Sequence, residues 1–588
     1  MAAKKKASFI VDPAVYDKLK KVRASTTVSL KPTPMLRTEV TGFDGSLQPF
    51  NLRYYQTQGI YHLLSLNRMI LGDGTGLGKT LEVIGALAYI WGRNHVSKAI
   101  VVAPKSALRQ WAAEIDRFAT GITTYVVDGT AQARRETYEE FLSHPVGEGE
   151  DKAVLILNYH LLVRDWGAGA EKTTLPNGKP GPMTPGLLDA LTAQLKGLIV
   201  IYDEATAFKN ANTKTHQVCS WLSARAGRCY GLTATLLKNN LIEGFAIYQC
   251  IVPGLFTTKT GFMNNYCVTK LQPVAGGRKI PIIVGYKNLE AFRERIDPVF
   301  LGRPKHVVSD ELPTLITREV VVELTKAEDA KYSQALTGVI ELGDGEVKDY
   351  EEHKAFVALI YCQQVVDSLT LLKFEAGDEI DTDIFHMEQA PVAEMGSKEA
   401  AMMNLLTEEF DGEKVIVYTR FASLVPRLQE LCKKAKIKSV AITGKVKDTY
   451  KNPARKKAQD AFQDPESDTR VIFITDAGSE SINLQAASAM FFFDAPWSWG
   501  NYVQLLGRPI RIGSPHQHVV AIHLVAERPA NSKTARKTID HYTLAMLQKK
   551  KNLVDRVLGE SAVGALDFDA GMSFTKELVM NLQRGRDK

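Results

Sequence analysis

LGDGTGLGKT, residues 71–80, carries four glycines within seven positions, followed by Lys79 and Thr80. A glycine-rich loop that ends in Lys-Thr is typical of a phosphate-binding P-loop, because its exposed backbone N–H groups can surround phosphate oxygens. The strict pattern G-x-x-x-x-G-K-[ST] would place its first glycine at position 73, where this chain has Asp73. The stretch is therefore either a nucleotide site with one altered residue or a glycine-rich turn before a lysine.

The sequence on either side of the loop favours a nucleotide site. A short apolar run precedes the loop, and apolar residues recur at the spacing of one helix face after it, at Val83, Ile84, Leu87, Ala88 and Trp91. A strand, a glycine loop and a helix in this order are the context of a P-loop. In that context Lys79 would reach the β- and γ-phosphates of ATP, and Thr80 would hold Mg²⁺ through its hydroxyl.

A second stretch, LIVIYDEATAFKN at 198–210, supplies the carboxylates that such a loop requires. Its apolar residues predict a buried strand that ends at Asp203 and Glu204, and ligands bind at the carboxyl edge of open α/β sheets. Asp203 would bind Mg²⁺, and Glu204 would orient and deprotonate the attacking water. The alternative is a solvated turn, which an isolated Asp-Glu pair more often forms.

Composition indicates a large, water-soluble protein. The chain has 588 residues, which is too many for one core, with 45% apolar and 24% charged residues and a net charge of +7. No apolar run approaches the roughly 20 residues that span a bilayer, and the N-terminus MAAKKKASF lacks the apolar core of a secretion signal. The six cysteines form no C-x-x-C pair, so we expect reduced, structural cysteines in a cytoplasmic compartment and no zinc site.

The pattern of apolar runs predicts two α/β lobes with parallel sheets, separated by helical insertions and a linker. The expected strands of the first lobe are 69–71, 99–103, 154–157, 198–202 and 229–232, and those of the second are 415–418, 439–442, 471–474, 490–493 and 519–524. Residues 166–186 are expected to be a flexible surface insertion. The predicted domains are an N-terminal arm or small subdomain (1–48), a first lobe (49–250), a helical insertion and linker (251–394), a second lobe (395–530), a closing helix (531–560, with its helical pattern at 533–558) and a tail (561–588).

These motifs together resemble the Swi/Snf-type ATPases of helicase superfamily 2. In that family Asp commonly begins the P-loop motif, and Asp203-Glu204-Ala205-Thr206 resembles the DEAH/DEAQ box. Further motifs follow in family order: LRYYQTQG (52–59), VVAPKSALRQWAAEI (101–115), GLTATLLKNN (231–240), GYKNLEAFRERIDPVFLGRPK (285–305), DAGSESINLQ (476–485), QLLGRPIRIG (504–513) and QKKKNLVDRVLGE (548–560). The match covers about residues 49–560 and implies two RecA-like lobes, with ATP between them and DNA across them, in a phage or bacterial relative.

The resemblance implies a role for each matched residue. The catalytic residues would be Lys79, Asp203, Glu204, Arg508 and Arg511, and the metal ligands Thr80 and Asp203. ATP would contact Gln56, Asp73, Gly74, Thr75, Gly76, Leu77, Gly78, Lys79, Thr80 and Gln504. Backbone phosphates of DNA would contact Pro104, Lys105, Ser106, Gly478 and Ser479, and coupling between the sites would involve Thr206, Thr233 and Thr235.

Several positions depart from the family pattern. Thr206 stands where the family has His or Gln, Leu236 and Lys238 replace a Pro and a Gln, Arg420 replaces a Gln, and Ser481 replaces a glycine. None of these changes removes a group that hydrolysis requires, so they concern the efficiency of coupling. Arg508 and Arg511 are one helical turn apart, so both could face the cleft as arginine fingers; a surface salt-bridge pair is the alternative. Trp497 or Trp499 could stack on a base, although a packing role is favoured.

The predicted function is an ATP-driven translocase on double-stranded DNA, which remodels forks and branches or displaces bound proteins. A strand-separating helicase on DNA or RNA is the alternative enzyme, and an ATP-gated clamp without hydrolysis is the alternative from another class. A remodeller associated with RNA polymerase also stays open. We expect sequence-independent contacts to double-stranded, branched or single-stranded nucleic acid, ATP and Mg²⁺ as cofactors, no membrane partner and a monomer in the cytoplasm.

Overall fold

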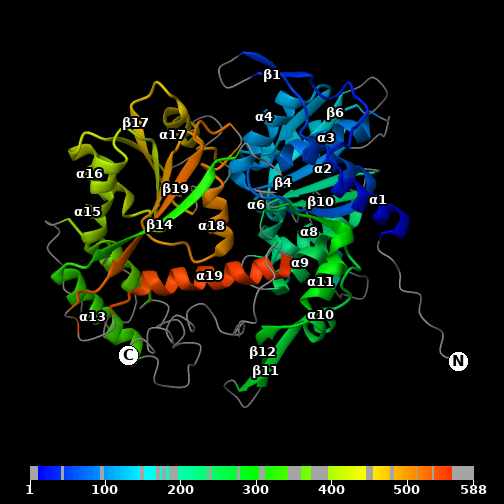
Figure 1. Cartoon of the computed structure of the whole chain (residues 1–588). Helices are drawn as coiled ribbons and strands as arrows, with labels where there is room; N and C mark the ends of the chain where they lie inside the picture. Colours follow the sequence, from blue (N-terminus) through cyan, green and yellow to red (C-terminus); the bar gives the residue numbers. More distant parts are fainter. Residues whose placement is uncertain are drawn as a thin grey trace. The chain divides into compact units, whose positions relative to one another are not determined.

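The computed structural model describes residues 11–41, 46–92, 98–145, 151–166, 172–174, 180–183, 197–234, 236–237, 241–273, 279–303, 312–341, 359–372, 395–444, 454–476, 482–511, 513–530, 532 and 536–558. Contacts divide the chain into two compact units (Figure 1). Unit 1 contains Met1–Met263 and Glu290–Asp310, and unit 2 contains Asn264–Leu289 and Glu311–Lys588. Each unit has its own parallel sheet with helices, which confirms the predicted fold class.

Unit 1 is built on a seven-stranded sheet in which every neighbouring pair is parallel. In spatial order the strands are β13 (Phe300–Leu301), β3 (Arg68–Leu71), β10 (Arg228–Leu232), β9 (Ile199–Asp203), β4 (Ala99–Ala103), β6 (Lys152–Asn158) and β5 (Ile122–Val126). The five predicted strands are present, and β4 and β6 are buried along their whole length. The strands β5 and β13 escape the apolar pattern, because β5 is a half-buried edge and β13 is only two residues long.

The helices of unit 1 cover this sheet. They include α2 (Tyr54–Ser65), α3 (Lys79–Trp91), α4 (Leu108–Phe118), α5 (Ala131–Ser143), α6 (Tyr159–Trp166), α8 (Lys214–Arg225) and α9 (Leu241–Ile251). In one group α3 packs against both α2 and α4, and in another α8 packs against both α6 and α9. The apolar face predicted for residues 81–91 is confirmed, since Val83, Ile84 and Trp91 lie in the core that joins α3 to β3 and β4.

The N-terminal helix α1 (Pro13–Ala24) belongs to the core of unit 1. It begins with Pro13 after Asp12, whose side chain accepts a hydrogen bond from the Ala14 backbone at 2.8 Å, an arrangement that caps the exposed N–H groups. Leu19 is fully buried in the same cluster as α2 and α3. The described part of 1–48 is therefore packed onto the first lobe through α1.

Short antiparallel pairs and connecting helices complete the chain outside the two sheets. The pairs are β1 (Glu39–Thr41) with β2 (Leu47–Pro49), β7 (Lys172–Thr174) with β8 (Pro180–Met183), and β11 (Cys267–Pro273) with β12 (Lys279–Tyr286). The pair β7–β8 lies within 166–186, so the described part of that predicted insertion forms a hairpin. The chain passes from unit 1 into unit 2 within α10 (Lys259–Tyr266) and returns to unit 1 at the start of α11 (Leu289–Ile296).

Unit 2 is built on a six-stranded sheet, again parallel throughout. In spatial order the strands are β14 (Thr314–Glu323), β19 (His518–Glu527), β18 (Ala489–Phe492), β15 (Val415–Tyr418), β17 (Thr469–Ile474) and β16 (Lys438–Ile442). The five predicted strands are confirmed. The expectation of only helices and linker between 251 and 394 was wrong for β11, β12, β13 and β14. The edge strand β14 is mostly exposed, so it lacks the buried pattern that reveals a strand in sequence.

The helices of unit 2 are α13 (Lys326–Glu341), α15 (Ser397–Asn404), α16 (Val425–Lys434), α17 (Ala454–Gln463), α18 (Trp499–Leu506) and α19 (Ile539–Leu558). The predicted closing helix is present as α19, although it begins at Ile539 rather than at residue 533. Among the helices that the structure describes, none combines the length and the apolar character that crossing a membrane requires.

A buried cation fixes α15 and α19 to unit 2. The Lys398 ammonium is fully buried and donates to Asp367 at 2.8 Å, to Asp540 at 2.7 Å and to the Phe493 carbonyl at 2.9 Å. Gln363 donates to both carboxylates, at 3.1 Å and 2.9 Å. These contacts join helical residues 359–367, the start of α15, the end of β18 and the first turn of α19.

Candidate ATP site

The carboxyl ends of four neighbouring strands bring the predicted ATP-site residues of unit 1 together. The P-loop follows β3, Thr233 follows β10, Asp203 ends β9 and Pro104 follows β4. Because these strands are parallel and adjacent, the residues after them lie at one edge of the sheet. Residues that are up to 160 positions apart in sequence, Asp73 and Thr233, thus lie at neighbouring strand ends, where the Thr233 backbone donates to Leu71 at 3.1 Å.

Glycine is required in the loop 72–78 for different structural reasons at different positions. Gly76 and Gly78 both adopt φ of 86°, a left-handed conformation that side chains rarely tolerate. Gly78 also touches Gln56, because an added Cβ would lie 2.8 Å from the Gln56 Nε2. Gly72 has another role: a Cβ there would lie 2.4 Å from the Phe300 ring, so this glycine makes room for β13 rather than for phosphate.

Lys79 begins α3 and its ammonium turns back into the loop. Its Nζ donates to the carbonyls of Asp73 at 2.8 Å and of Gly74 at 3.2 Å. Burial lowers the pKa of Lys79, while the carboxylates of Glu204, Asp73 and Asp203 act in the opposite direction. The lysine thus lies in the field of both predicted catalytic carboxylates, and Thr80 occupies the next position of the same helix turn.

Asp203 is held in place from two sides. The Trp111 indole Nε1, on α4, donates to its carboxylate at 2.8 Å, and the Tyr159 hydroxyl donates to its backbone carbonyl at 2.7 Å. Burial, together with the neighbouring Glu204 charge, raises the pKa of Asp203 to about 6. The Trp111 hydrogen bond and the nearby Lys79 charge act on this pKa in the opposite direction but do not offset the burial.

Glu204 has a strained backbone. It adopts φ of 52° and ψ of 58°, a left-handed conformation that non-glycine residues take up rarely. Such conformations cost about 1–3 kcal/mol and cluster at functional sites. This conformation turns the chain sharply at Glu204, directly after Asp203 ends β9. Thr206 is buried in the short 3₁₀ segment Ala205–Phe208 that follows.

The oxygen atoms of Asp203 and Thr80 suit a Mg²⁺ ion that is also bound by nucleotide phosphates. Within the described residues, no group of three or more His, Cys, Asp or Glu side chains forms a metal cluster. Mg²⁺ prefers oxygen ligands and is commonly held by one or two protein oxygens plus substrate phosphates. The Asp203 carboxylate and the Thr80 hydroxyl are oxygen donors of that kind, so the residues fit the group.

Gln56 contacts the P-loop directly. It lies in the first turn of α2, is 3% exposed, and its Nε2 donates to the Leu77 carbonyl at 3.4 Å. Its Oε1 accepts from the Arg53 backbone at 3.0 Å, which closes the start of α2. Gln56 and the loop 73–80 are therefore neighbours, as their predicted roles require, whereas Thr235 lies outside the described residues.

Of the two predicted DNA-contacting segments, the structure describes the turn after β4, in unit 1. Pro104 precedes the 3₁₀ segment Lys105–Ala107, Lys105 is exposed, and the Ser106 hydroxyl is buried without a hydrogen-bond partner. The same turn leads into α4, which carries Trp111. Gly478 and Ser479 lie outside the described residues.

In unit 2, Arg508 and Arg511 do not lie on one face of a helix as predicted. The helix α18, which carries Gln504, ends at Leu506, because Gly507 and Pro509 follow and the chain enters turns there. The buried Arg508 donates from Nη1 to the Ile482 carbonyl at 3.4 Å. Arg511 donates from Nε to the Gly507 carbonyl at 2.9 Å and from Nη1 to the Asn483 side chain. Both arginines thus contact residues 482–483, which lie within the motif 476–485 that carries the predicted phosphate contacts Gly478 and Ser479.

One of the departures from the family pattern, Arg420, contacts Trp497 in unit 2. The Arg420 guanidinium lies 3.7 Å from the centre of the Trp497 ring, and the Lys550 ammonium donates to the Trp497 carbonyl at 2.9 Å. The Arg420 backbone N–H also donates to Asp494 at 3.1 Å. Arg420 therefore has a partner in Trp497, which favours a packing role for that tryptophan over base stacking.

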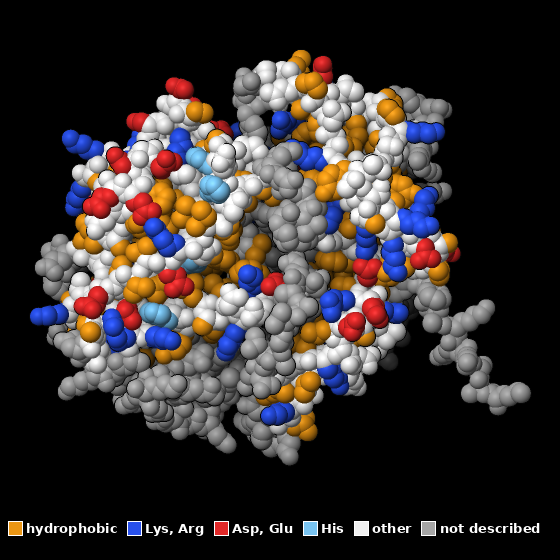
Figure 2. Space-filling view, viewed as in Figure 1, with side chains coloured by type: hydrophobic (Ala, Val, Ile, Leu, Met, Phe, Trp, Pro, Cys, Tyr) orange, Lys and Arg blue, Asp and Glu red, His pale blue; other side chains and the backbone are white. Residues whose placement is uncertain are grey.

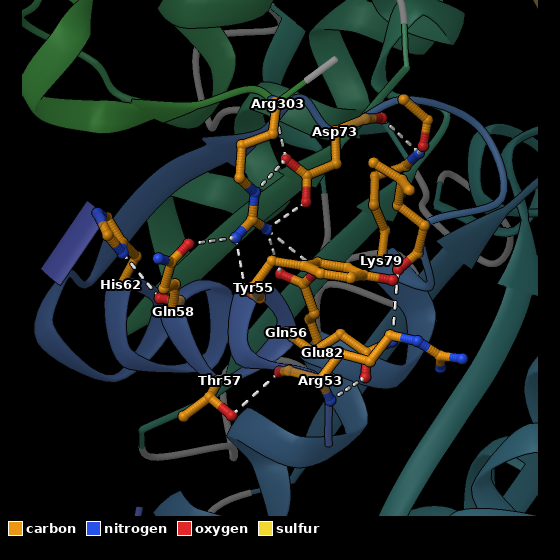
Figure 3. A network of polar contacts seen from close by, with 12 residues as sticks. Arg53, Tyr55, Gln56, Thr57, Gln58, His62, Asp73, Lys79, Glu82 and Arg303 are labelled. Carbon is orange, nitrogen blue, oxygen red and sulfur yellow. Dashed lines mark hydrogen bonds and ion pairs between the residues drawn. The ribbon is translucent and has the colours of Figure 1, made fainter. Parts of the chain in front are cut away.

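Sequence reasoning missed Arg303, although it contacts Asp73 and Gly74 of the nucleotide loop. Arg303 pairs with Asp73 and with Glu82 and reaches α2 at Tyr55 and Gln58 (Figure 3). Trp111 and Tyr159 were missed as well. These contacts join residues that are 44 to 248 positions apart, and no spacing in the sequence indicates such pairs.

Comparison with known proteins identifies the family. The SNF2-related domain matches residues 55–371, and the helicase conserved C-terminal domain matches residues 397–513. This chain belongs to the SNF2-related family. The resemblance seen in the sequence is therefore confirmed.

Individual relatives of this SNF2-related chain are distant. An uncharacterized ATP-dependent helicase of Mycoplasma pneumoniae is 23% identical over 539 residues, which cover 90% of this chain and 44% of the relative. The ISWI chromatin-remodeling complex ATPase ISW1 of Saccharomyces cerevisiae is 24% identical, over 89% of this chain and 44% of the relative. The chain thus spans less than half the length of these curated relatives. The solved Sulfolobus solfataricus SWI2/SNF2 ATPase core in complex with dsDNA aligns over 95% of this chain at 21% identity with a TM-score of 0.36, too weak a likeness to support an argument.

Proposed function

We propose that this chain is an ATP-dependent translocase on double-stranded DNA, which remodels forks and branches or displaces bound proteins. The observation that carries the proposal is the shared sheet edge of unit 1. Lys79, Asp203 and Glu204 lie at that edge, and the turn 104–106 follows the next strand, β4. Trp111, one turn further along the same segment, bonds to Asp203, so a nucleic-acid contact at the turn has a short route to the metal ligand.

The chemistry at this edge follows from its residues. Lys79 would leave the two loop carbonyls and pair with the β- and γ-phosphates, which are stronger partners for an ammonium. Thr80 and Asp203 would hold Mg²⁺, and the bound ion would withdraw charge from the phosphate oxygens. Glu204 would orient the attacking water and accept its proton. Trp111 and Tyr159 keep Asp203 fixed while this occurs.

Arg508 and Arg511 are proposed to complete the reaction as arginine fingers. Phosphoryl transfer spreads negative charge over the γ-phosphate oxygens, and an arginine finger contributes roughly 10³–10⁵-fold in rate. Their present bonds to backbone carbonyls and to Asn483 orient two guanidinium groups from one short segment. Single alanine variants that kept the full DNA-stimulated rate would contradict the finger role.

DNA contact is proposed to be sequence-independent. Lys105, Ser106, Gly478 and Ser479 are suited to phosphate oxygens, and such contacts carry no base information. On the face in Figure 2, Lys and Arg side chains are dispersed among acidic ones and do not form one continuous patch. We therefore expect a few localised phosphate contacts, with an affinity that falls as salt rises in proportion to their number.

The deciding experiment measures ATP turnover with single-stranded DNA, duplex, forked DNA, a Holliday junction and RNA in parallel, with Glu204→Gln as the inactive control. Duplex or branched DNA should stimulate most, and triplex displacement from the duplex should show movement without strand separation. Separation of a plain duplex would favour a helicase. ATP binding without turnover would favour a clamp, and stimulation by RNA alone would contradict a DNA substrate.

A further inference from the structure

Asp73, the residue that breaks the strict P-loop pattern, is fully buried and makes two different kinds of contact. Its carboxylate accepts from the Arg303 backbone N–H and from Arg303 Nε, both at 3.0 Å, and pairs with Nη2 of the same guanidinium. Its backbone carbonyl accepts from the Lys79 ammonium at 2.8 Å. One residue therefore contacts both the lysine of the nucleotide loop and Arg303.

Arg303 also fastens the elements on either side of the loop. Its Nη2 lies 3.1 Å and 3.2 Å from the two Glu82 oxygens, on α3. Its Nη1 donates to the Tyr55 carbonyl and, at 3.2 Å, to the Gln58 side chain, both on α2 (Figure 3). One guanidinium thus reaches the loop and both helices that border it.

The backbone around Arg303 is paired with the loop as well. The short strand β13 lies parallel to β3, the Gly72 N–H donates to the Leu301 carbonyl at 2.6 Å, and the Gly74 N–H donates to the Arg303 carbonyl at 3.1 Å. The Phe300 ring occupies the space above Gly72. Residues 300–303 and 72–74 therefore form one continuous hydrogen-bonded layer.

The segment 297–303 is held at its other end by α1. Arg23 donates to the Asp297 carboxylate at 2.7 Å and to the carbonyls of Asp297 and Phe300, both at 2.8 Å, and the Tyr16 hydroxyl also bonds to Asp297. Eight residues beyond Arg303, at Glu311, the chain enters unit 2. The segment is thus the last described part of unit 1 before the chain enters unit 2.

We propose that Arg303 is a positioning residue, which couples nucleotide occupancy of the loop to the order of segment 297–303. Nucleotide phosphates would draw Lys79 away from the Asp73 and Gly74 carbonyls. The backbone of residue 73 would then rearrange, and its carboxylate would carry the change to Arg303, because the forked ion pair fixes their mutual geometry. Coupling of this kind is reciprocal, so the segment in turn sets nucleotide affinity. The inference rests on nucleotide binding at the proposed ATP site.

Glu82 allows this coupling to be separated from a purely structural role. It pairs with the same guanidinium, is as buried as Asp73 and hydrogen-bonds to the Asp73 carboxyl. The bonds that tie Asp73 to Lys79 and to the Arg303 backbone do not involve it. If Arg303 only neutralised buried charge, removal of either carboxylate charge would have similar consequences for nucleotide binding. If Arg303 positions the loop, only the Asp73 change would matter.

The test compares Asp73→Asn with the matched control Glu82→Gln and the conservative variant Arg303→Lys in the full chain. Two quantities are measured: the dissociation constant for MgADP, and hydrogen exchange of peptides that cover 297–303 with and without MgADP. Asp73→Asn should weaken MgADP binding about tenfold, within the usual range of coupling between sites, and remove the nucleotide-dependent change in exchange. Glu82→Gln should stay within about twofold of the parent and keep that change, because it leaves the Asp73–Arg303 pair intact.

Arg303→Lys keeps the charge but loses the planar fork, so it should fall between the other two variants in both measurements. If a low melting temperature shows that Asp73→Asn does not fold, the comparison of Arg303→Lys with Glu82→Gln tests the proposal instead. Equal behaviour of Asp73→Asn and Glu82→Gln would overturn this inference and leave the proposed function intact. A parent chain that does not bind MgADP would overturn both.

Discussion

Each unit contains one cation buried between two carboxylates, yet the two clusters have different consequences. In unit 1 Arg303 lies between Asp73 and Glu82, and in unit 2 Lys398 lies between Asp367 and Asp540. The composition is almost the same, and both clusters are close to fully buried. The Arg303 cluster includes a residue of the nucleotide loop, whereas the Lys398 cluster joins helices to the sheet and touches no predicted site residue.

The difference shows that a buried ion pair does not reveal its role by its charge. The Lys398 ammonium uses its three donors on two carboxylates and one carbonyl, which satisfies a compact point charge. The Arg303 guanidinium spreads its donors over the loop, α2 and α3. A residue that contacts several elements at a ligand site can relay a change, while one that closes a helix junction mainly stabilises it.

The largest expected effect tests whether the edge next to the Arg303 cluster is the reactive one. Glu204→Gln should lower ATP turnover by roughly 10²–10⁴-fold, because the amide cannot accept a proton from the attacking water. Steady-state phosphate release measures the rate, and nucleotide binding provides the control, since the side chain keeps its size. A turnover equal to that of the parent would place the general base elsewhere.

The next effect concerns the Lys398 cluster and should appear in stability rather than in nucleotide binding. Lys398→Met leaves Asp367 and Asp540 buried without their cation, and breaking a buried pair costs about 3–5 kcal/mol of unfolding free energy. Urea unfolding measures this cost. The folded fraction should still bind MgADP within about twofold of the parent, because coupling between distant sites is at least several-fold where it exists. Weakened binding would mean that both clusters serve the nucleotide.

A smaller effect follows from the pKa of Asp203, which burial raises to about 6. Mg²⁺ binds the ionised carboxylate, so apparent Mg²⁺ affinity should be full above pH 7 and fall about tenfold by pH 5. Mg²⁺ titrations of nucleotide-bound protein across this range measure the change. In Asp203→Asn the affinity should be low and independent of pH in this window, and a pH-dependent response of that variant would assign the titration to another group.

The smallest expected effect concerns the second carboxylate of each cluster, since each cluster has two carboxylates and one cation. Burial raises the pKa of both Glu82 and Asp367, so the folded chain retains protons that the unfolded chain releases above about pH 4. Their contribution to stability therefore declines as pH rises through the raised pKa values. Glu82→Gln and Asp367→Asn remove this surplus charge and should each change stability by less than about 1 kcal/mol at pH 7, since replacing buried ionic groups by neutral ones is often close to neutral. A loss of several kcal/mol in either variant would show that both charges of its cluster are required.

The local pattern of apolar residues in the sequence was sufficient to predict much of the fold. Nine of the ten predicted strands are mostly buried, and they were predictable because a strand covered on both faces must be apolar along its length; the tenth, β16, is a half-buried edge strand. The edge strands β5 and β14 were not, since an exposed edge imposes no such pattern, and β13 has only two residues to show one. Likewise, α18 ends before Arg508 and Arg511, so their spacing of three did not indicate a shared helix face.

By itself the sequence was enough to predict a nucleotide site at the edge of unit 1. A glycine loop with Lys79 and Thr80, followed by a strand that ends in Asp203 and Glu204, requires only local order to predict a nucleotide site, and the family match confirms its class. Tertiary structure alone decided which residues hold that site in place. Asp73 and Arg303 are 230 positions apart and Trp111 and Asp203 are 92 apart, and only the folded sheet brings such groups within hydrogen-bonding distance.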